Sequence, residues 1–257
     1  MGLRSTEAIV IGGHNLGEAD RIVVFYTRRY GKVRAVAKGA RRIRSRFGGS
    51  LELFTHGRLV YFEKPHTDLH RISEFGIVEP FRSLRDSLEM LTAASVVAEL
   101  AGIAGVEGEG GEELFSLLLN ALQTLNREGE PTILLRAFEI RLLKILGYLP
   151  ELYKCVRCRG DLPSDGTQSF SLADAGLLCL LCRKEAIETM PLSPPALGFL
   201  RGVLQGGTGF SRLSLEPKSA EALKTLLQTF LEMKLGRKIR SARFLQAFPL
   251  TLPPSLK

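Results

Sequence analysis

Four cysteines constrain this sequence more than any other feature. They form two CxxC pairs, Cys155–Cys158 and Cys179–Cys182, with twenty residues between the pairs. Two short knuckles at this spacing let four thiolates converge on one tetrahedral Zn²⁺ ion, and the segment between them is long enough for a small hairpin. We therefore predict one structural zinc ion. A redox-active CxxC pair is the alternative, but two pairs without a βαβ context favour the metal.

The spacing of apolar residues changes near residue 80. Before it, five segments rich in Val, Ile, Phe and Tyr predict strands at 6–13, 20–27, 32–38, 51–62 and 69–78. Five strands in so short a region are typical of an oligonucleotide-binding (OB) barrel, although other small five-stranded barrels fit as well. After Pro80, spacing of three and four residues predicts helices at 83–104, 112–126, 132–146, 194–204 and 219–235.

These patterns predict an α+β multidomain chain. We expect an OB-fold β-barrel in residues 1–80 and an α-helical domain in residues 81–257, with the four-cysteine zinc finger inserted at about 149–188. A closed site of four cysteines leaves no coordination position open, so the ion should hold the shape of the finger rather than catalyse a reaction.

The charge of the chain indicates an anionic partner. Lys and Arg number 35 against 27 Asp and Glu, which gives a net charge of +8, and such an excess most often serves nucleic-acid binding. Ten of the basic residues lie between Arg21 and Leu51, a stretch without a single acid. The residues that we predict to contact DNA phosphates in this stretch are Lys32, Arg34, Lys38, Arg41, Arg42, Arg44 and Arg46.

Two details refine that prediction. Lys32 and Arg34 alternate with apolar residues, so one face of their strand should be basic, and the basic loop of residues 38–49 follows directly. Phe47 in this loop either stacks on a base or anchors the loop to the barrel, and we favour anchoring. A second basic segment near the C-terminus adds Lys234, Arg237, Lys238, Arg240 and Arg243. The alternative for all of these cations is a solvated surface on a basic protein.

Catalytic signatures are absent from the sequence. It contains no phosphate-binding GxxxxGK[ST], no HExxH, no GxSxG and no complete GxGxxG motif, and the lysine of Lys38-Gly39 lacks the Asp expected in a nucleotidyl-transfer motif. The acids of the middle segment do not suggest the carboxylate cluster of a nuclease. We expect a binding protein rather than an enzyme. Without an export signal or an apolar run of about 18–20 residues, we also expect a cytoplasmic protein with no membrane partner.

Several stretches resemble the bacterial RecO family of recombination mediators. The matching residues are 17–23, 30–32, 35–42 and 45–49, and Leu146-Gly147-Tyr148-Leu149-Pro150 before Cys155 resembles the family's entry to its zinc module. The resemblance covers about the whole chain and is most specific between Lys38 and Gly49. It implies a DNA-repair protein, associated with the nucleoid, that binds single- and double-stranded DNA and anneals complementary strands. It also implies help in loading recombinase onto DNA coated by single-strand-binding protein.

Protein partners are implied by the same resemblance. They are the RecR protein and the acidic, Phe-ending tail of single-strand-binding protein, with the recombinase as an indirect partner. Such a tail needs an apolar pocket beside a cation, because its carboxylate must be paired while its ring is buried. The cations of the helical domain are Arg127, Arg136, Arg141 and Lys144, of which we take Arg136 and Arg141 first.

Two other functions are compatible with parts of the sequence. An RNA- or transcription-associated adaptor would also combine an OB fold with a zinc ribbon, and a preference for single-stranded RNA over DNA would favour it. An enzyme of nucleic-acid processing is disfavoured by the missing acidic cluster, and turnover of an oligonucleotide with Mg²⁺ would revive it.

Overall fold

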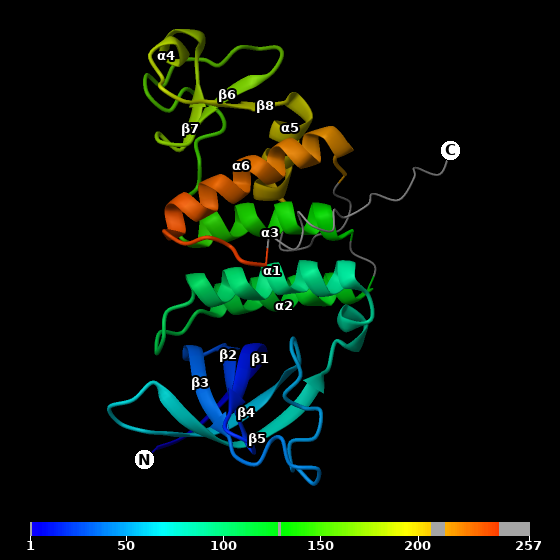
Figure 1. Cartoon of the computed structure of the whole chain (residues 1–257). Helices are drawn as coiled ribbons and strands as arrows, with labels where there is room; N and C mark the ends of the chain where they lie inside the picture. The colour runs from blue at the N-terminus through cyan, green and yellow to red at the C-terminus, as the bar shows by residue number, and fades with distance from the viewer. Residues whose placement is uncertain (1, 128–129, 207–213, 242–257) are drawn as a thin grey trace. The chain divides into compact units, whose positions relative to one another are not determined.

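A computed structural model describes residues 2–127, 130–206 and 214–241 of the chain (Figure 1). The chain forms two compact units, one of residues 1–128 with 240–248 and the other of residues 129–239 with 249–257. The change from strands to helices near residue 80 is present, but the first two long helices pack with the barrel. The compact units divide near residue 128, and the predicted domain boundary near residue 80 coincides with the change from strands to helices.

The first unit is built on a five-stranded closed barrel. Its strands are β1 (Gly2–Leu16), β2 (Asp20–Thr27), β3 (Gly31–Ala37), β4 (His56–Glu63) and β5 (Leu69–Glu79). They follow one another around the barrel in the order β1-β2-β3-β5-β4, and β4 pairs with β1 to close it. All neighbours are antiparallel except β3 and β5, which are parallel. This arrangement confirms the predicted OB fold.

Strand alternation fills the barrel interior. On β3, the side chains of Val33, Ala35 and Ala37 belong to the buried core, while the residues between them point outward. Phe25 of β2 and Phe75 of β5 meet inside the barrel with their ring centroids 5.2 Å apart. The same pleat therefore builds the apolar core and sets the outer face of β3.

One predicted strand is too long. The sequence pattern predicts a strand at 51–62, but residues 51–55 form turns, and β4 begins at His56. Leu51 and Phe54 are buried beneath these turns, which explains their apolar character without strand pairing. An apolar run signals burial, and burial alone does not distinguish a strand from a tightly packed loop.

Two helices cover the outside of the barrel. The 3₁₀ helix η1 (Arg82–Arg85) leads to α1 (Leu88–Ala104), and α2 (Glu112–Arg127) lies beside α1 in Figure 1. The predicted helix at 83–104 is thus interrupted at Ser87, whose Oγ accepts a hydrogen bond from the Met90 amide and caps α1. The Gly-rich segment 105–111 between α1 and α2 packs on the outward ring of Tyr26, and burial raises the pKa of that phenol to about 12.

The second unit joins three helices to a small sheet. The helices are α3 (Pro131–Ile145), α5 (Pro194–Gln205) and α6 (Pro217–Leu235). The sheet has the order β7-β6-β8, formed by β6 (Gln168–Ser171), β7 (Gly176–Leu178) and β8 (Met190–Leu192), with α4 (Leu180–Lys184) after β7. The rings of Phe170 and Phe230 pack edge to face with their centroids 5.7 Å apart, which fixes this sheet to α6.

The close approach of segment 105–111 to the barrel makes Gly31 a sensitive position. Its φ of +55° favours glycine, and a Cβ there would overlap the carbonyl oxygens of Val106 and Glu109. We predict that Gly31→Ala lowers the free energy of unfolding by roughly 2–5 kcal/mol, measured by urea denaturation. Gly17→Ala is the matched control, because Gly17 has a φ of +60° but open space around its Cβ. Equal losses in the two variants would contradict the prediction.

Candidate nucleic-acid interface and metal site

The outer face of β3 carries two of the predicted DNA-binding cations. Lys32 and Arg34 project from the barrel because Val33 and Ala35 point into its core. Each is already engaged in an ion pair: Lys32 Nζ lies 3.6 Å from Glu107 Oε1, and Arg34 Nη1 lies 3.7 Å from Asp68 Oδ2. The basic face predicted from the sequence is therefore present but partly neutralised. The two acids come from distant segments, so the residues around β3 could not reveal them.

The basic loop, residues 38–49, begins the long connection from β3 to β4. It is built from successive turns, such as the hydrogen bonds from the Ser45 amide to the Arg42 carbonyl and from the Ser50 amide to the Phe47 carbonyl. The Phe47 side chain enters the barrel core and is 5% exposed. The preference for anchoring over base stacking is thereby confirmed. A buried ring near the end of the loop holds the adjacent basic residues against the barrel.

The cations of the basic loop have different environments. Arg41 donates from Nη1 to the carbonyl oxygens of Gly17 and Glu18, and Arg46 donates to the carbonyl oxygen of Ile72 while its guanidinium stacks on Phe47. These two arginines therefore also support the loop. The exposed cations of the loop with neither an ion pair nor a side-chain hydrogen bond to any residue described by the structure are Lys38, Arg42 and Arg44.

The basic residues near the C-terminus fall around the end of α6. Lys234 is in the last turn of that helix, where its Nζ lies 5.3 Å from the centre of the Phe230 ring and 5.8 Å from that of Tyr148. Arg237, Lys238 and Arg240 are exposed. Arg243, another predicted contact, lies outside the described residues. This group supplies exposed positive charge, and Ile239, which lies between Lys238 and Arg240, is buried.

The four cysteines come together as their spacing predicts. Their sulfur atoms all lie within 4.8 Å of one another, so the cluster could hold a metal ion. The Sγ atoms of Cys158 and Cys179 are 3.7 Å apart, and a tetrahedron with Zn–S bonds of about 2.3 Å has edges of about 3.8 Å. The donor set and its size thus fit Zn²⁺. No other group of His, Cys, Asp and Glu among the described residues has metal-binding geometry.

The backbone of the first knuckle prepares the thiols for a cation. The Arg159 amide donates to the Cys155 carbonyl, and Arg159 takes a left-handed conformation with φ of 62° that turns the chain back. Burial by itself raises the pKa of the Cys155 thiol. Hydrogen bonds from backbone amides, of which the Cys158 amide contributes most, outweigh burial and lower this pKa to about 6. The hydrogen bond with Cys179 and burial raise the pKa of Cys182 to about 12. Four thiolates this close together repel one another, so the thiols cannot all ionise without a cation. A bound dication would offset this repulsion.

The two arginines predicted for a partner tail are not equivalent surface cations. Arg136 is 3% exposed and donates from Nη2 to Glu139 Oε1 at 2.6 Å, within α3. Burial raises the pKa of the Glu139 carboxyl to about 7, although Arg136 acts in the opposite direction. A buried, paired guanidinium does not present its charge to a peptide, so the position of Arg136 does not support that prediction. Arg141 is half-buried and stays a prediction.

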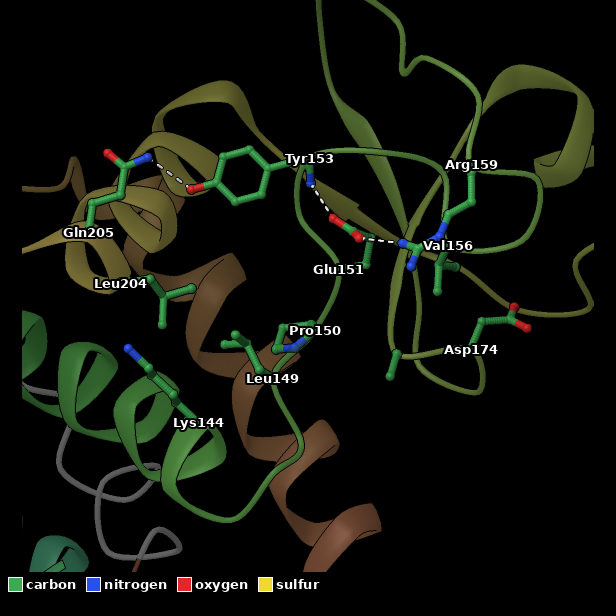
Figure 2. Close-up of a pocket in the computed structure, with 11 residues that line it drawn as sticks. Lys144, Leu149, Pro150, Glu151, Tyr153, Val156, Arg159, Asp174, Leu204 and Gln205 are labelled. Atoms are coloured by element: carbon green, nitrogen blue, oxygen red, sulfur yellow. Dashed lines mark hydrogen bonds and ion pairs between the residues drawn. The ribbon is translucent and has the colours of Figure 1, made fainter. Parts of the chain in front are cut away.

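A cavity of about 660 Å³ lies between the end of α3, the entry to the zinc module and the end of α5 (Figure 2). Apolar side chains of Leu149 and Leu204 line it beside Lys144, which is exposed and forms no ion pair with a described residue. On its other side, Glu151 accepts a hydrogen bond from Arg159 at 2.6 Å. Sequence reasoning counted Lys144 among the available cations but did not find the cavity, whose only local signal is the motif at 146–150.

Comparisons with known proteins agree with this architecture. Residues 1–81 match the family model described as Recombination protein O N terminal, and residues 85–243 match Recombination protein O C terminal. The chain belongs to the RecO family. Proteins named DNA repair protein RecO are similar to it over most of its length. The RecO protein of Roseiflexus sp. is 36% identical over 93% of this chain and 84% of its own length. The RecO protein of Symbiobacterium thermophilum is 35% identical over 95% of this chain and 97% of its own length.

Family membership makes the chain a DNA repair protein of RecO type. The RecO protein of Pelotomaculum thermopropionicum is 33% identical over 96% of this chain and 95% of its own, so the likeness includes both the barrel and the helical part. Within the described part of the chain, the helices are too short or too polar to span a bilayer.

Proposed function

We propose that the chain binds single- and double-stranded DNA through the basic loop and anneals complementary strands. The observation that carries this proposal is the set of exposed, unpaired cations Lys38, Arg42 and Arg44 on a loop anchored by Phe47. An anchored loop loses little backbone conformational entropy when its cations meet phosphates. They also lower the repulsion between two strands, which annealing requires. The cations Lys234, Arg237, Lys238 and Arg240 form a proposed second contact.

The wider role follows from the family. We propose that the protein helps to load recombinase onto DNA coated by single-strand-binding protein, together with RecR, and that it acts by binding rather than by catalysing a reaction. This role belongs in the cytoplasm, at the nucleoid. The alternative, an RNA-associated adaptor, would require tighter binding of single-stranded RNA than of DNA of the same sequence, and parallel titrations distinguish the two.

The basic loop generates a prediction about salt. Each phosphate contact to single-stranded DNA contributes about 0.7 log units of affinity per log unit of salt. We predict that Arg42→Ala with Arg44→Ala flattens this slope by about 1.4 units, measured by fluorescence anisotropy at several salt concentrations. The annealing rate of complementary oligonucleotides should fall as well.

The control for this measurement is a lone arginine elsewhere on the barrel. Arg58 of β4 is exposed and lacks an ion pair with any described residue, so Arg58→Ala removes the same charge as Arg44→Ala. We expect it to leave the slope unchanged, whereas Arg44→Ala lowers it by about 0.7 units. Equal slopes in wild type and in the Arg42/Arg44 double variant would contradict binding at the loop, and the cations near the C-terminus would become the leading site.

We also propose that the cysteine cluster holds one structural Zn²⁺ ion. The tetrahedral spacing of the sulfur atoms supports this assignment, and four protein ligands leave no position for a substrate. When bound, the ion would fix two knuckles that otherwise contain crowded, partly ionised thiols. Its contribution would therefore be to the fold of the zinc module.

Metal analysis tests the zinc assignment. We predict about one zinc per purified chain, and we expect Cys158→Ser to lose the metal and to unfold the zinc module while the barrel stays folded. Arg157→Ala is the matched control, because Arg157 lies within the same knuckle but its guanidinium pairs with Asp174. Freshly purified wild type with well under half an equivalent of zinc would contradict the proposal.

For the acidic tail of single-strand-binding protein, we propose the cavity shown in Figure 2. A Phe-ending tail needs an apolar wall and a nearby cation, and Leu149, Leu204 and Lys144 supply these. The charge of Lys144 is available, whereas that of Arg136 is occupied by Glu139. This choice replaces Arg136 by Lys144 as the first cation to test.

Two substitutions on α3 distinguish binding from stability. We predict that Lys144→Ala weakens binding of an acidic, Phe-ending peptide about tenfold and leaves thermal unfolding unchanged. Arg136→Ala should instead lower the free energy of unfolding by about 3–5 kcal/mol, because it leaves Glu139 buried without its partner. A peptide affinity that is the same in Lys144→Ala and wild type would remove this cavity as the tail site.

A further inference from the structure

A second cavity lies at the end of the barrel that carries the basic loop. Its volume is about 430 Å³, within the range of about 300–1,000 Å³ that is typical of small-molecule sites. Its wall is formed by the end of the basic loop, the turns that follow it, the end of β5 and η1. The lining residues that matter for its chemistry are Phe47, Ser50, Glu52, Ile77, Arg82 and Asp86.

One residue of the cavity wall carries a buried polar atom without a partner. Ser50 is 7% exposed, and its Oγ has no hydrogen-bond partner among the described residues. A buried hydroxyl without a partner is destabilising, so a ligand group that bonds to it would gain a hydrogen bond that the free protein lacks. The apolar contribution comes from Ile77, which is half-exposed at 49% in the same wall.

Two residues in the segments around the cavity have a strained backbone conformation. Phe54 and Phe81 have φ angles of 72° and 44°, and both side chains are buried. Arg85, which also lines the cavity, ties the two segments together by donating from Nη1 to the carbonyl oxygens of Leu53 at 2.6 Å and Pro80 at 3.1 Å. Non-glycine residues in this region of φ persist only where the surrounding contacts hold them. The cavity is therefore preformed.

The charges of the lining indicate a neutral ligand. Arg82 and Arg85 are balanced by Glu52 and Asp86, so the cavity does not attract a chain of phosphates as the basic loop does. A nucleobase is neutral, with flat apolar faces and polar edges, and suits a cavity that has Ile77 on its wall and hydrogen-bonding groups around it. We propose that this cavity receives one nucleobase of the DNA strand whose phosphates bind the basic loop.

This inference rests on the proposed DNA binding and adds a ligand class to it. The two carboxylates of the lining are hydrogen-bond acceptors, and cytosine, adenine and guanine each offer an exocyclic amino group. Thymine has no such group. A base with an amino group therefore binds more tightly than thymine at this position, although the phosphate contacts themselves carry no sequence information.

The test uses the full-length protein and a single-stranded dT oligonucleotide with one central substitution. With central 2-aminopurine, which carries an amino group, we expect emission to change on binding as the base leaves its neighbours and enters the cavity. With central dC in place of dT, we expect tighter binding. Ile77→Asp should abolish the emission change and reduce affinity for the dC oligonucleotide about tenfold, as expected for loss of one base contact.

Val78→Asp is the matched control. Val78 follows Ile77 on β5 and is 64% exposed, but it does not line the cavity, so the variant adds the same charge without entering the site. It should keep the emission change and the preference for dC, and circular dichroism should show that both variants fold. Glu52→Ala gives a milder second variant, expected to weaken the preference for dC because it removes one of the two lining carboxylates.

Two outcomes separate this inference from the proposed function. If Ile77→Asp and Val78→Asp behave alike, or if wild type does not distinguish dC from dT, the nucleobase site is overturned while salt-dependent binding at the basic loop stands. If wild type shows no salt-dependent binding of the oligonucleotide at all, both the proposed function and the nucleobase site are overturned.

Discussion

The parallel pairing of β3 with β5 is the constraint on which the first unit depends. It closes the barrel and leaves β3 and β4 without a shared edge, so the chain between them must cross one end of the barrel. That connection carries the basic loop, the buried ring of Phe47 and the turns that lead to β4. The proposed phosphate contacts and the cavity beside them both follow from this one connection, because they share its backbone.

The parts of the fold that sequence could predict are those encoded by local periodicity. Alternation of Val33 and Ala35 with basic residues identified both the strand and its outward face, and the spacing of the cysteines identified a cluster whose geometry fits a metal. The strand prediction was wrong at 51–55 because Leu51 and Phe54 are buried in turns. Local periodicity reports which residues avoid water, and it does not report which backbone shape hides them.

The packing of distant segments could not be predicted from the sequence. Arg136 belongs to a largely apolar helix in which an arginine suggests a surface charge, yet it is buried against Glu139 one turn away. Whether such a pair faces solvent or a neighbouring helix depends on the packing of α6, which α3 alone does not reveal. The cavities have the same origin, since each is formed by segments that lie far apart along the chain.

The ion pairs on β3 give its cations counterions that are side chains of the protein itself. A free chloride ion displaced from Lys32 by a phosphate would diffuse away and gain entropy, whereas Glu107 stays tethered to the protein when it is displaced. DNA that reaches this strand would exchange one anion for another, with little net gain from each contact. On the proposed path, DNA would bind tightly at the basic loop and weakly along β3. Such a distribution suits a protein that transfers its DNA to another protein.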